Sequence, residues 1–198
     1  RRRYGAGWRL CGKTGSPAEF PPLVVSCRDD NAQRIAALDE RAEALGLKPG
    51  MGIADARAMH PSIEIMEADP DADRRLLESL ADWCDRYTPL VALDGTDGLL
   101  LDISGCAHLF GGEDAMLAQI VHRLTHQGFD VRVALASTPG MAWAMARFCR
   151  GQMRNVAQGE EESAIAPMPL AALRLEEKTR SGLESIGLRH VGALIGAP

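Results

Sequence analysis

The sequence has 198 residues, of which 46% are hydrophobic and 25% are charged, and its formal net charge is −5. This balance is typical of a soluble globular protein with one sizeable hydrophobic core or two small ones. No apolar run is long enough to cross a bilayer, which argues against a membrane protein. The acidic balance argues against a strongly basic nucleic-acid binder, but it is compatible with a local basic face.

The start of the chain and its cysteines indicate where the protein works. No apolar segment follows Arg1–Tyr4, so we expect no signal peptide, and the missing initiator Met suggests a piece of a longer protein. The five cysteines are scattered and form no CxxC pair, which indicates neither a zinc site nor a disulfide framework. We therefore expect a cytoplasmic protein with reduced thiols and no cofactor.

The first third of the chain predicts short strands and helices. Residues 21–27 form a β-type run after two prolines and are predicted to be an edge strand. A turn is predicted at residues 29–31. Residues 34–38 are expected to lead into a helix through Ala44, which Gly46 ends. A helix over residues 53–59 and a strand over residues 63–66 follow.

The rest of the chain shows the strand–helix–strand–helix order that suits a ferredoxin-like domain. Apolar residues at helical spacing predict a helix over residues 71–87, and residues 98–103 predict a strand. The elements expected next are a helix over 113–127, a strand over 131–136, a helix over 139–150 and a strand near 155–157. A hinge with Pro167 and Pro169 then precedes a helix that ends near Gly187.

Four segments, in this order, resemble motifs of the Y-family DNA polymerases. Residues 45–61 are similar to the family's fingers segment FGIKAGMPLAEAKRLCP. The run RYTPL at residues 86–90 resembles RYTPLVE, DGLLLDIS at 97–104 resembles the palm strand DEAFLDVS, and IGLRHVG at 186–192 resembles LGIRTVGDL of the thumb. Each match alone is weak, but the ordered set is specific. Within the family, residues 101–113 and 137–144 are most like the ImuB-type members.

This resemblance implies an α+β fold. It places a fingers-like region at residues 1–66, a ferredoxin-like palm at 67–158 and the start of a helix–hairpin–helix thumb at 159–198. ImuB-type members serve mutagenic repair as an accessory subunit and are not thought to polymerise, so we expect a non-catalytic, DNA-associated adaptor in translesion synthesis. The implied partners are DNA, a RecA-like accessory protein, the β sliding clamp through regions beyond this chain, and an error-prone replicative-type DNA polymerase.

The positions that would hold catalytic metals are altered relative to the family. Phosphoryl transfer by a polymerase uses two Mg²⁺ ions held by clustered carboxylates. The family's palm strand supplies an adjacent Asp-Glu pair; here Asp97 matches the Asp, but Gly98 stands at the Glu position. We therefore expect no catalytic residue and no metal site. Asp97 is the residual metal candidate, and its interpretation as a turn acid is slightly favoured.

The positions that would hold the incoming triphosphate are altered as well. The Tyr and Arg of the family's YEAR helix align with Glu40 and Glu43, and a Lys of its later palm helix aligns with Trp143. Two like charges within a few ångströms cost about 1 kcal/mol in water and several times more when partly desolvated. We therefore expect no nucleotide site. A solvated helix face is an alternative account of the glutamates, and Trp143 is expected to pack in the core, with a partner contact as the alternative.

The thumb segment carries the predicted DNA contacts. The candidates for binding phosphate are Arg174, Lys178, Arg180, Arg189 and His190. The family's GIG hairpin, whose backbone amides grip DNA phosphate, aligns with residues 174–176, where the glycines are missing. Two other interpretations stay open: an active Y-family polymerase with replacement ligands, and, more remotely, a ferredoxin-like metabolic or interaction domain without a nucleic-acid role.

Overall fold

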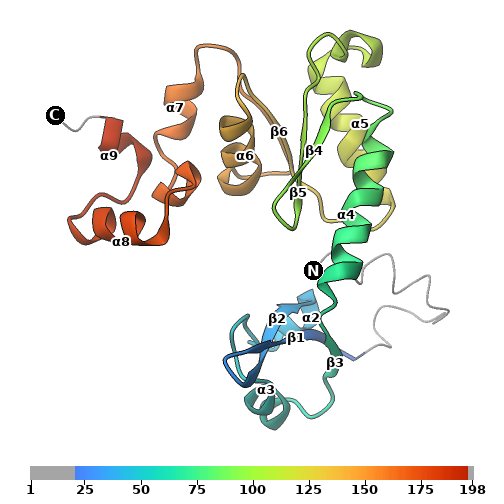
Figure 1. Ribbon diagram of the computed structural model, residues 1–198, viewed down its shortest axis with the longest axis vertical. Coiled ribbons are helices and arrows are strands. Elements are labelled where there is room, and N and C mark those ends of the chain that lie inside the picture. Colours follow the sequence, from blue (N-terminus) through green and yellow to red (C-terminus); the bar gives the residue numbers. More distant parts are fainter. Residues whose placement is uncertain (1–20, 196–198) are drawn as a thin grey trace. The chain divides into compact units, whose positions relative to one another are not determined.

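The computed structural model describes residues 21–195, and the chain divides into two compact units, Arg1–Leu76 and Leu77–Pro198 (Figure 1). The predicted absence of a signal peptide concerns residues that lie outside the described ones. Among the described residues, no helix is long and apolar enough to cross a membrane.

The first unit contains a three-stranded sheet in the order β2-β1-β3. Strand β1 (Leu23–Asp29) pairs antiparallel with β2 (Ala32–Leu38) and parallel with β3 (Glu64–Glu67). The prediction of an edge strand at the start was wrong, because β1 is the central strand. Pro21 and Pro22 precede β1, so their missing N–H groups remove no hydrogen bond from its ladder.

Two short helices complete the first unit. Residues 32–38 form a strand, and helix α2 (Glu40–Ala44) begins only after Asp39, whose carboxylate accepts a hydrogen bond from the Ala42 amide at 2.8 Å. Helix α3 (Ile53–Met59) has the bounds that the sequence predicts. The buried core of the unit consists of Val24, Ile35, Leu38, Ala42, Leu47, Ala56 and Ile63.

The second unit contains two separate pairs of strands. The β4 (Val91–Asp94) and β5 (Gly98–Leu101) strands form an antiparallel hairpin, whereas β6 (Val133–Leu135) and β7 (Met153–Asn155) pair in parallel. Within residues 21–195 no ladder joins these pairs into one four-stranded sheet. Three longer helices pack with them: α4 (Pro70–Cys84), which contains the boundary between the units, α5 (Glu113–His126) and α6 (Pro139–Phe148).

The RYTPL motif anchors the β4–β5 hairpin. The Thr88 hydroxyl is buried; it donates to the carbonyl oxygen of Asp102 at 2.5 Å and accepts from the Leu90 amide at 3.2 Å. Tyr87 is also buried and packs against Trp83 and Phe110, with ring centroids 5.6 and 5.2 Å away. In this chain the motif therefore links the two ends of the hairpin to the helical core.

The last segment consists of short helices. They are α7 (Glu161–Ile165), η3 (Leu170–Leu173), α8 (Glu177–Ser185) and α9 (Val191–Ile195). A further short helix, η2 (Ala107–Phe110), lies earlier in the unit, before α5. The amide of Gly192 donates to the carbonyl oxygen of Ala166 at 2.8 Å, and a Cβ on this glycine would lie 3.1 Å from the same oxygen. Gly192 therefore lets α9 approach α7 closely.

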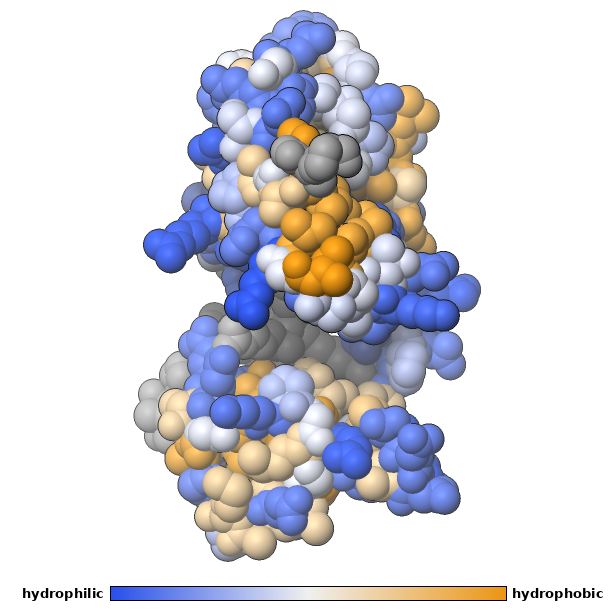
Figure 2. Space-filling model, turned by 90° about the vertical axis from the view of Figure 1, so that its left-hand side faces the viewer, coloured by the Kyte–Doolittle hydropathy of each residue, from blue (hydrophilic) through white to orange (hydrophobic). Residues whose placement is uncertain are grey.

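Apolar side chains of this segment remain at its surface. Helix α8 buries none of its residues, and Ile186 and Ile195 are 73% and 47% exposed. The face shown in Figure 2 carries an orange apolar area in the same unit. The segment packs on the rest of the unit through η3 and the start of α9, where Leu170 and Val191 are buried, and through Ala164 and Ile165 of α7.

Candidate functional site

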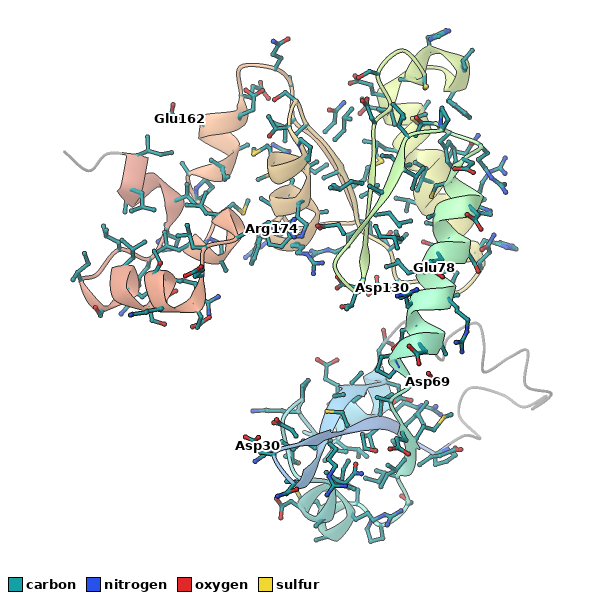
Figure 3. All side chains as sticks on the ribbon, viewed as in Figure 1. Asp30, Asp69, Glu78, Asp130, Glu162 and Arg174 are labelled. Atoms are coloured by element: carbon teal, nitrogen blue, oxygen red, sulfur yellow. The ribbon has the colours of Figure 1, made fainter. Side chains whose placement is uncertain are left out.

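Five side chains from three parts of the second unit meet beside the β4–β5 turn. Asp94 ends β4 and Asp97 precedes β5, while Trp143 and Arg147 lie one turn apart on α6. Arg174, which follows η3, lies beside α6 (Figure 3). We call these five residues the arginine–tryptophan cluster. It surrounds the position at which the sequence predicts a degenerate catalytic site.

Asp97 is bound by an arginine. The Arg147 guanidinium donates one hydrogen bond to Asp97 Oδ2 at 3.1 Å and a second, short one to Oδ1. This bonding raises the pKa of Arg147 above its ordinary value. A two-point contact of this kind is among the stronger charge-assisted interactions in proteins. The carboxylate that aligns with a metal ligand is therefore already neutralised by a cation of the same chain.

Trp143 provides a platform for two guanidinium groups. The Cζ atoms of Arg147 and Arg174 lie 5.1 and 4.7 Å from the centroid of its ring, within the range of cation–π attraction. The same ring meets Phe148 edge to face at 5.9 Å and packs against a buried cluster that includes Met145. Trp143 is therefore half-buried and packs against the core, as expected, and it also contacts the two arginines.

Arg174 adopts an uncommon backbone conformation. Its φ of 55° is left-handed, which costs a residue with a side chain about 1–2 kcal/mol. Its guanidinium donates to Asp94 Oδ1 at 2.8 Å and lies over Trp143, so these contacts offset part of that cost. This is the first position of the segment that aligns with the family's GIG hairpin. Arg174 is thus left-handed without being a glycine.

Gly98 occupies a place that has no room for a side chain. It pairs with Asp94 across the hairpin, and a Cβ at Gly98 would lie 2.8 Å from the carbonyl oxygen of Asp94. Real Cβ atoms do not approach a backbone oxygen so closely, so a side chain here would force the hairpin to shift. A glycine at this position therefore permits the tight closure of the hairpin.

Comparison with known proteins identifies the group of proteins to which the chain is related. The model of the impB/mucB/samB family matches residues 19–147. The chain belongs to this family. Protein ImuB of Caulobacter vibrioides is 47% identical over 154 residues, which cover 78% of this chain and 33% of that protein. DNA polymerase IV 2 of Mesorhizobium japonicum is 25% identical over 163 residues, which cover 81% of this chain and 39% of that protein.

Solved structures share the fold. DinB from Sulfolobus solfataricus has a TM-score of 0.68 and 15% identity, and the match covers 98% of this chain and 58% of that one. The post-insertion binary complex of Dbh DNA polymerase has a TM-score of 0.73 and 14% identity, covering 100% of this chain and 59% of that one. The predicted Y-family α+β fold is confirmed. The chain spans about a third of the length of its curated relative ImuB.

The metal ions of the family's polymerases do not fit the residues of this cluster. Mg²⁺ needs several oxygen ligands at near-octahedral geometry. Gly98 supplies no side-chain oxygen, and both oxygens of Asp97 already accept hydrogen bonds from Arg147. Among the described residues, no three His, Cys, Asp or Glu side chains gather as metal ligands would.

Four of the five predicted DNA contacts, Arg174, Lys178, Arg189 and His190, are exposed. Lys178 lies on α8, and Arg189 and His190 precede α9. Two of the five are engaged within the chain: Arg174 as described above, and Arg180 with Glu177 and, at 3.8 Å, Glu184 on the same helix. Their role in binding DNA remains a prediction.

The two glutamates predicted to mark a lost nucleotide site belong to the first unit, whereas Asp97, Gly98 and Trp143 belong to the second. Glu40 and Glu43 lie one turn apart on α2, and both are exposed. In the second unit, sequence reasoning missed Arg147. Its spacing of four residues from Trp143 places both on one helix face, and this spacing is a signal that the sequence contains.

Proposed function

We propose that this chain is part of a non-catalytic, DNA-associated adaptor in DNA damage tolerance by translesion synthesis. The observation that carries the proposal is the two-point bond between Arg147 and Asp97, at the position where the resemblance to Y-family polymerases implies a metal ligand. The similarity to Protein ImuB supports the same role.

The physical argument concerns charge. A metal ion at Asp97 would have to displace Arg147. It would find no carboxylate at Gly98, and the other carboxylate of the cluster, Asp94, is already bonded to Arg174. Two-metal phosphoryl transfer also needs groups that balance the triphosphate. Trp143 stands where the family has a Lys, so the second unit offers a neutral ring there. Both changes oppose nucleotide binding and the chemical step.

The adaptor role implies other proteins. We extend to this chain the partners that the resemblance implies: a RecA-like accessory protein, the β sliding clamp and an error-prone replicative-type polymerase that performs the synthesis. Each of them, like a cytoplasmic location, belongs to this proposal. The chain spans a third of ImuB, so the contacts that ImuB makes with its partners need not all lie in the part that matches this chain.

Primer extension tests the loss of catalysis. We expect the protein to extend no primer with Mg²⁺ or Mn²⁺ and all four nucleotides. An active Y-family polymerase serves as the positive control, and the Asp97→Ala variant sets the background. Template-dependent extension above that background would show that the protein is an active polymerase.

Salt dependence tests the association with DNA. The cations that remain exposed in the thumb segment are few, so binding to primer–template DNA should be micromolar or weaker at physiological salt. Each neutralised phosphate contributes about −0.9 to the slope of log K against log salt, so we expect a slope of about −2 to −3.

A labelled primer–template titrated at several salt concentrations measures this slope. The double variant Lys178→Ala, Arg189→Ala should reduce its magnitude by about 2, whereas Arg57→Ala, which removes an exposed cation from α3, should leave it unchanged. Tight binding that hardly varies with salt would contradict the proposal, because it would require a desolvated and specific DNA site.

A further inference from the structure

Two histidines share the exposed face of helix α5. His122 and His126 lie four residues apart, which places their side chains one above the other on the same side of the helix. Their ring centroids are 6.4 Å apart, and the planes of the two rings differ by 30°. Neither ring has a hydrogen bond or an ion pair with another described residue. The two imidazoles are therefore close together and have nitrogen atoms that are not engaged within the described part of the chain.

The backbone beneath the two histidines is firmly placed. Ile120 and Leu124 precede them by two residues each, and both are buried. Two residues correspond to about 200° around the helix axis, so the buried side chains and the imidazoles occupy opposite faces of α5. The amides of Gly128 and Phe129 close the last turn, donating to the carbonyl oxygens of Thr125 and Leu124 at 2.9 and 3.0 Å. The core thus fixes the helix, while the imidazoles extend into solvent.

The spacing of the two imidazoles suits a transition-metal ion. Two histidines at positions i and i+4 of a helix can bind one ion together. A zinc–nitrogen distance of about 2.0–2.1 Å brings the ring centroids of two neighbouring ligands to about 4.5–5 Å. The observed separation of 6.4 Å exceeds this value by about 1.5 Å. Rotation about the side-chain torsions can close the difference without moving the helix, because both rings are exposed.

The surroundings select the class of ion. The carboxylates of α5, Glu113 and Asp114, lie in its first turn, far from the histidines in its last two turns. The end of the helix carries partial negative charge, which favours a cation, whereas the neighbouring Arg123 opposes one. Imidazole nitrogen suits Zn²⁺, Cu²⁺ and Ni²⁺, whereas Mg²⁺ prefers oxygen ligands. The pair therefore fits a transition-metal ion and does not fit the metal of a polymerase.

We propose that His122 and His126 form a binding site for a divalent transition-metal ion of the class of Zn²⁺ and Ni²⁺. The two imidazoles supply two adjacent ligands, and water occupies the remaining positions. In the described part of the chain, no three His, Cys, Asp or Glu side chains gather, so this site is weaker and more open than a structural zinc centre. It uses no residue of the arginine–tryptophan cluster, and it depends on neither the adaptor role nor the loss of catalysis.

Metal titration followed by NMR tests the site on the 198-residue chain. We expect Zn²⁺ to shift the ring Hε1 signals of His122 and His126 together, and Ni²⁺ to broaden the same two signals. Mg²⁺ at the same concentration should change neither. Equal Zn²⁺ shifts at His60, His108 and His190, or unchanged signals of the pair at millimolar Zn²⁺, would overturn the proposal. Either result would mean that the pair binds no better than a single histidine.

Variants locate the two ligands. His122→Ala and His126→Ala should each weaken Zn²⁺ binding by about tenfold or more, because a single imidazole cannot chelate. His108→Ala, which removes an exposed histidine from η2, should leave the affinity unchanged.

A matched control keeps two histidines on α5 but separates them. In the double variant Arg123→His, His126→Gln, the two imidazoles point about 100° apart around the helix, so it should bind Zn²⁺ as weakly as the single variants. Removal of the Arg123 charge favours a cation, so this control underestimates the effect of the spacing. Affinity equal to that of the parent protein would contradict the proposal.

Thermal melts give a second measurement. Zn²⁺ at about ten times its Kd should raise the melting midpoint of the parent protein by about 3–6 °C, because the ion binds the folded helix in preference to the unfolded chain. The double variant His122→Ala, His126→Ala should show no such rise, and its melt without metal shows whether it is folded. Equal rises in the two proteins would place the bound ion elsewhere, for example at the thiols, and would refute the site.

Discussion

We expect the Gly98→Glu variant to be less stable than the parent protein by about 1–3 kcal/mol and to gain no primer extension. The loss of stability follows from the hairpin, because a Cβ at this position would lie 2.8 Å from the carbonyl oxygen of Asp94. A backbone oxygen in a ladder cannot move aside without disturbing the pairing of β4 with β5. The substitution therefore adds a carboxylate, but it distorts the β4–β5 hairpin that would have to position this carboxylate.

The absence of activity has a separate cause. In Gly98→Glu, both oxygens of Asp97 still accept hydrogen bonds from Arg147, and Trp143 still stands where the family has a Lys. The added carboxylate therefore joins a site in which its neighbour is already neutralised. Metal binding would require the loss of the Arg147 bond as well.

Urea denaturation and primer extension measure the two effects. Gly140→Glu is the matched control, because the space around a Cβ at that position is open and the change in stability should be within about 0.5 kcal/mol. Gly98→Ala separates the Cβ clash from the effect of the added charge. Equal stability of Gly98→Glu and Gly140→Glu, or primer extension by the former, would refute this account of the hairpin.

The sequence was sufficient where local pattern and tertiary structure agree. Helix α3 has predicted bounds because its apolar spacing, a following proline and its packing all favour the same segment. Strand β2 was missed because Ala36 and Ala37 favour a helix locally, whereas pairing with β1 across the Asp30–Asn31 turn holds them in the sheet. Tertiary pairing outweighs such weak propensities.

In the candidate site, too, the residues within local motifs were predicted and those brought in by tertiary packing were not. Asp97, Gly98 and Trp143 were found because each is aligned by a short motif that resembles the family. Their partners were not, since the bond from Arg147 to Asp97 joins residues 50 apart in sequence and that from Arg174 to Asp94 joins residues 80 apart. No local pattern specifies which arginine meets which carboxylate at such separations. The packing of α6 and η3 determines the pairing.

A substitution toward the family's own residue should be the most damaging change in the cluster. We expect Trp143→Lys to lower the free energy of unfolding by about 2–4 kcal/mol, less than the 3–5 kcal/mol for removing a fully buried Trp because this ring is only half-buried. The ring attracts Arg147 and Arg174 from 5.1 and 4.7 Å, and a lysine would replace this attraction with repulsion among three cations.

Controls separate repulsion from lost packing. Trp143→Phe keeps an aromatic face and should cost less than Trp143→Lys, and Trp143→Met removes the ring without adding charge. If repulsion contributes, high salt should recover part of the stability of Trp143→Lys and leave Trp143→Met unchanged, because added ions screen exposed charges. Arg147→Met should also lower the free energy of unfolding less in the Trp143→Lys variant than in the parent protein.

A Trp143→Lys protein as stable as the parent would mean that the ring does not support the arginines. A loss of stability would instead mean that this site no longer accepts the lysine that the family's polymerases have there. A lysine at this position suits a site that holds a triphosphate, whereas here two arginines that bind Asp94 and Asp97 already occupy the surroundings. The carboxylates, the arginines and the ring therefore depend on one another, and restoring one residue of a polymerase should remove stability before it adds any affinity for nucleotide.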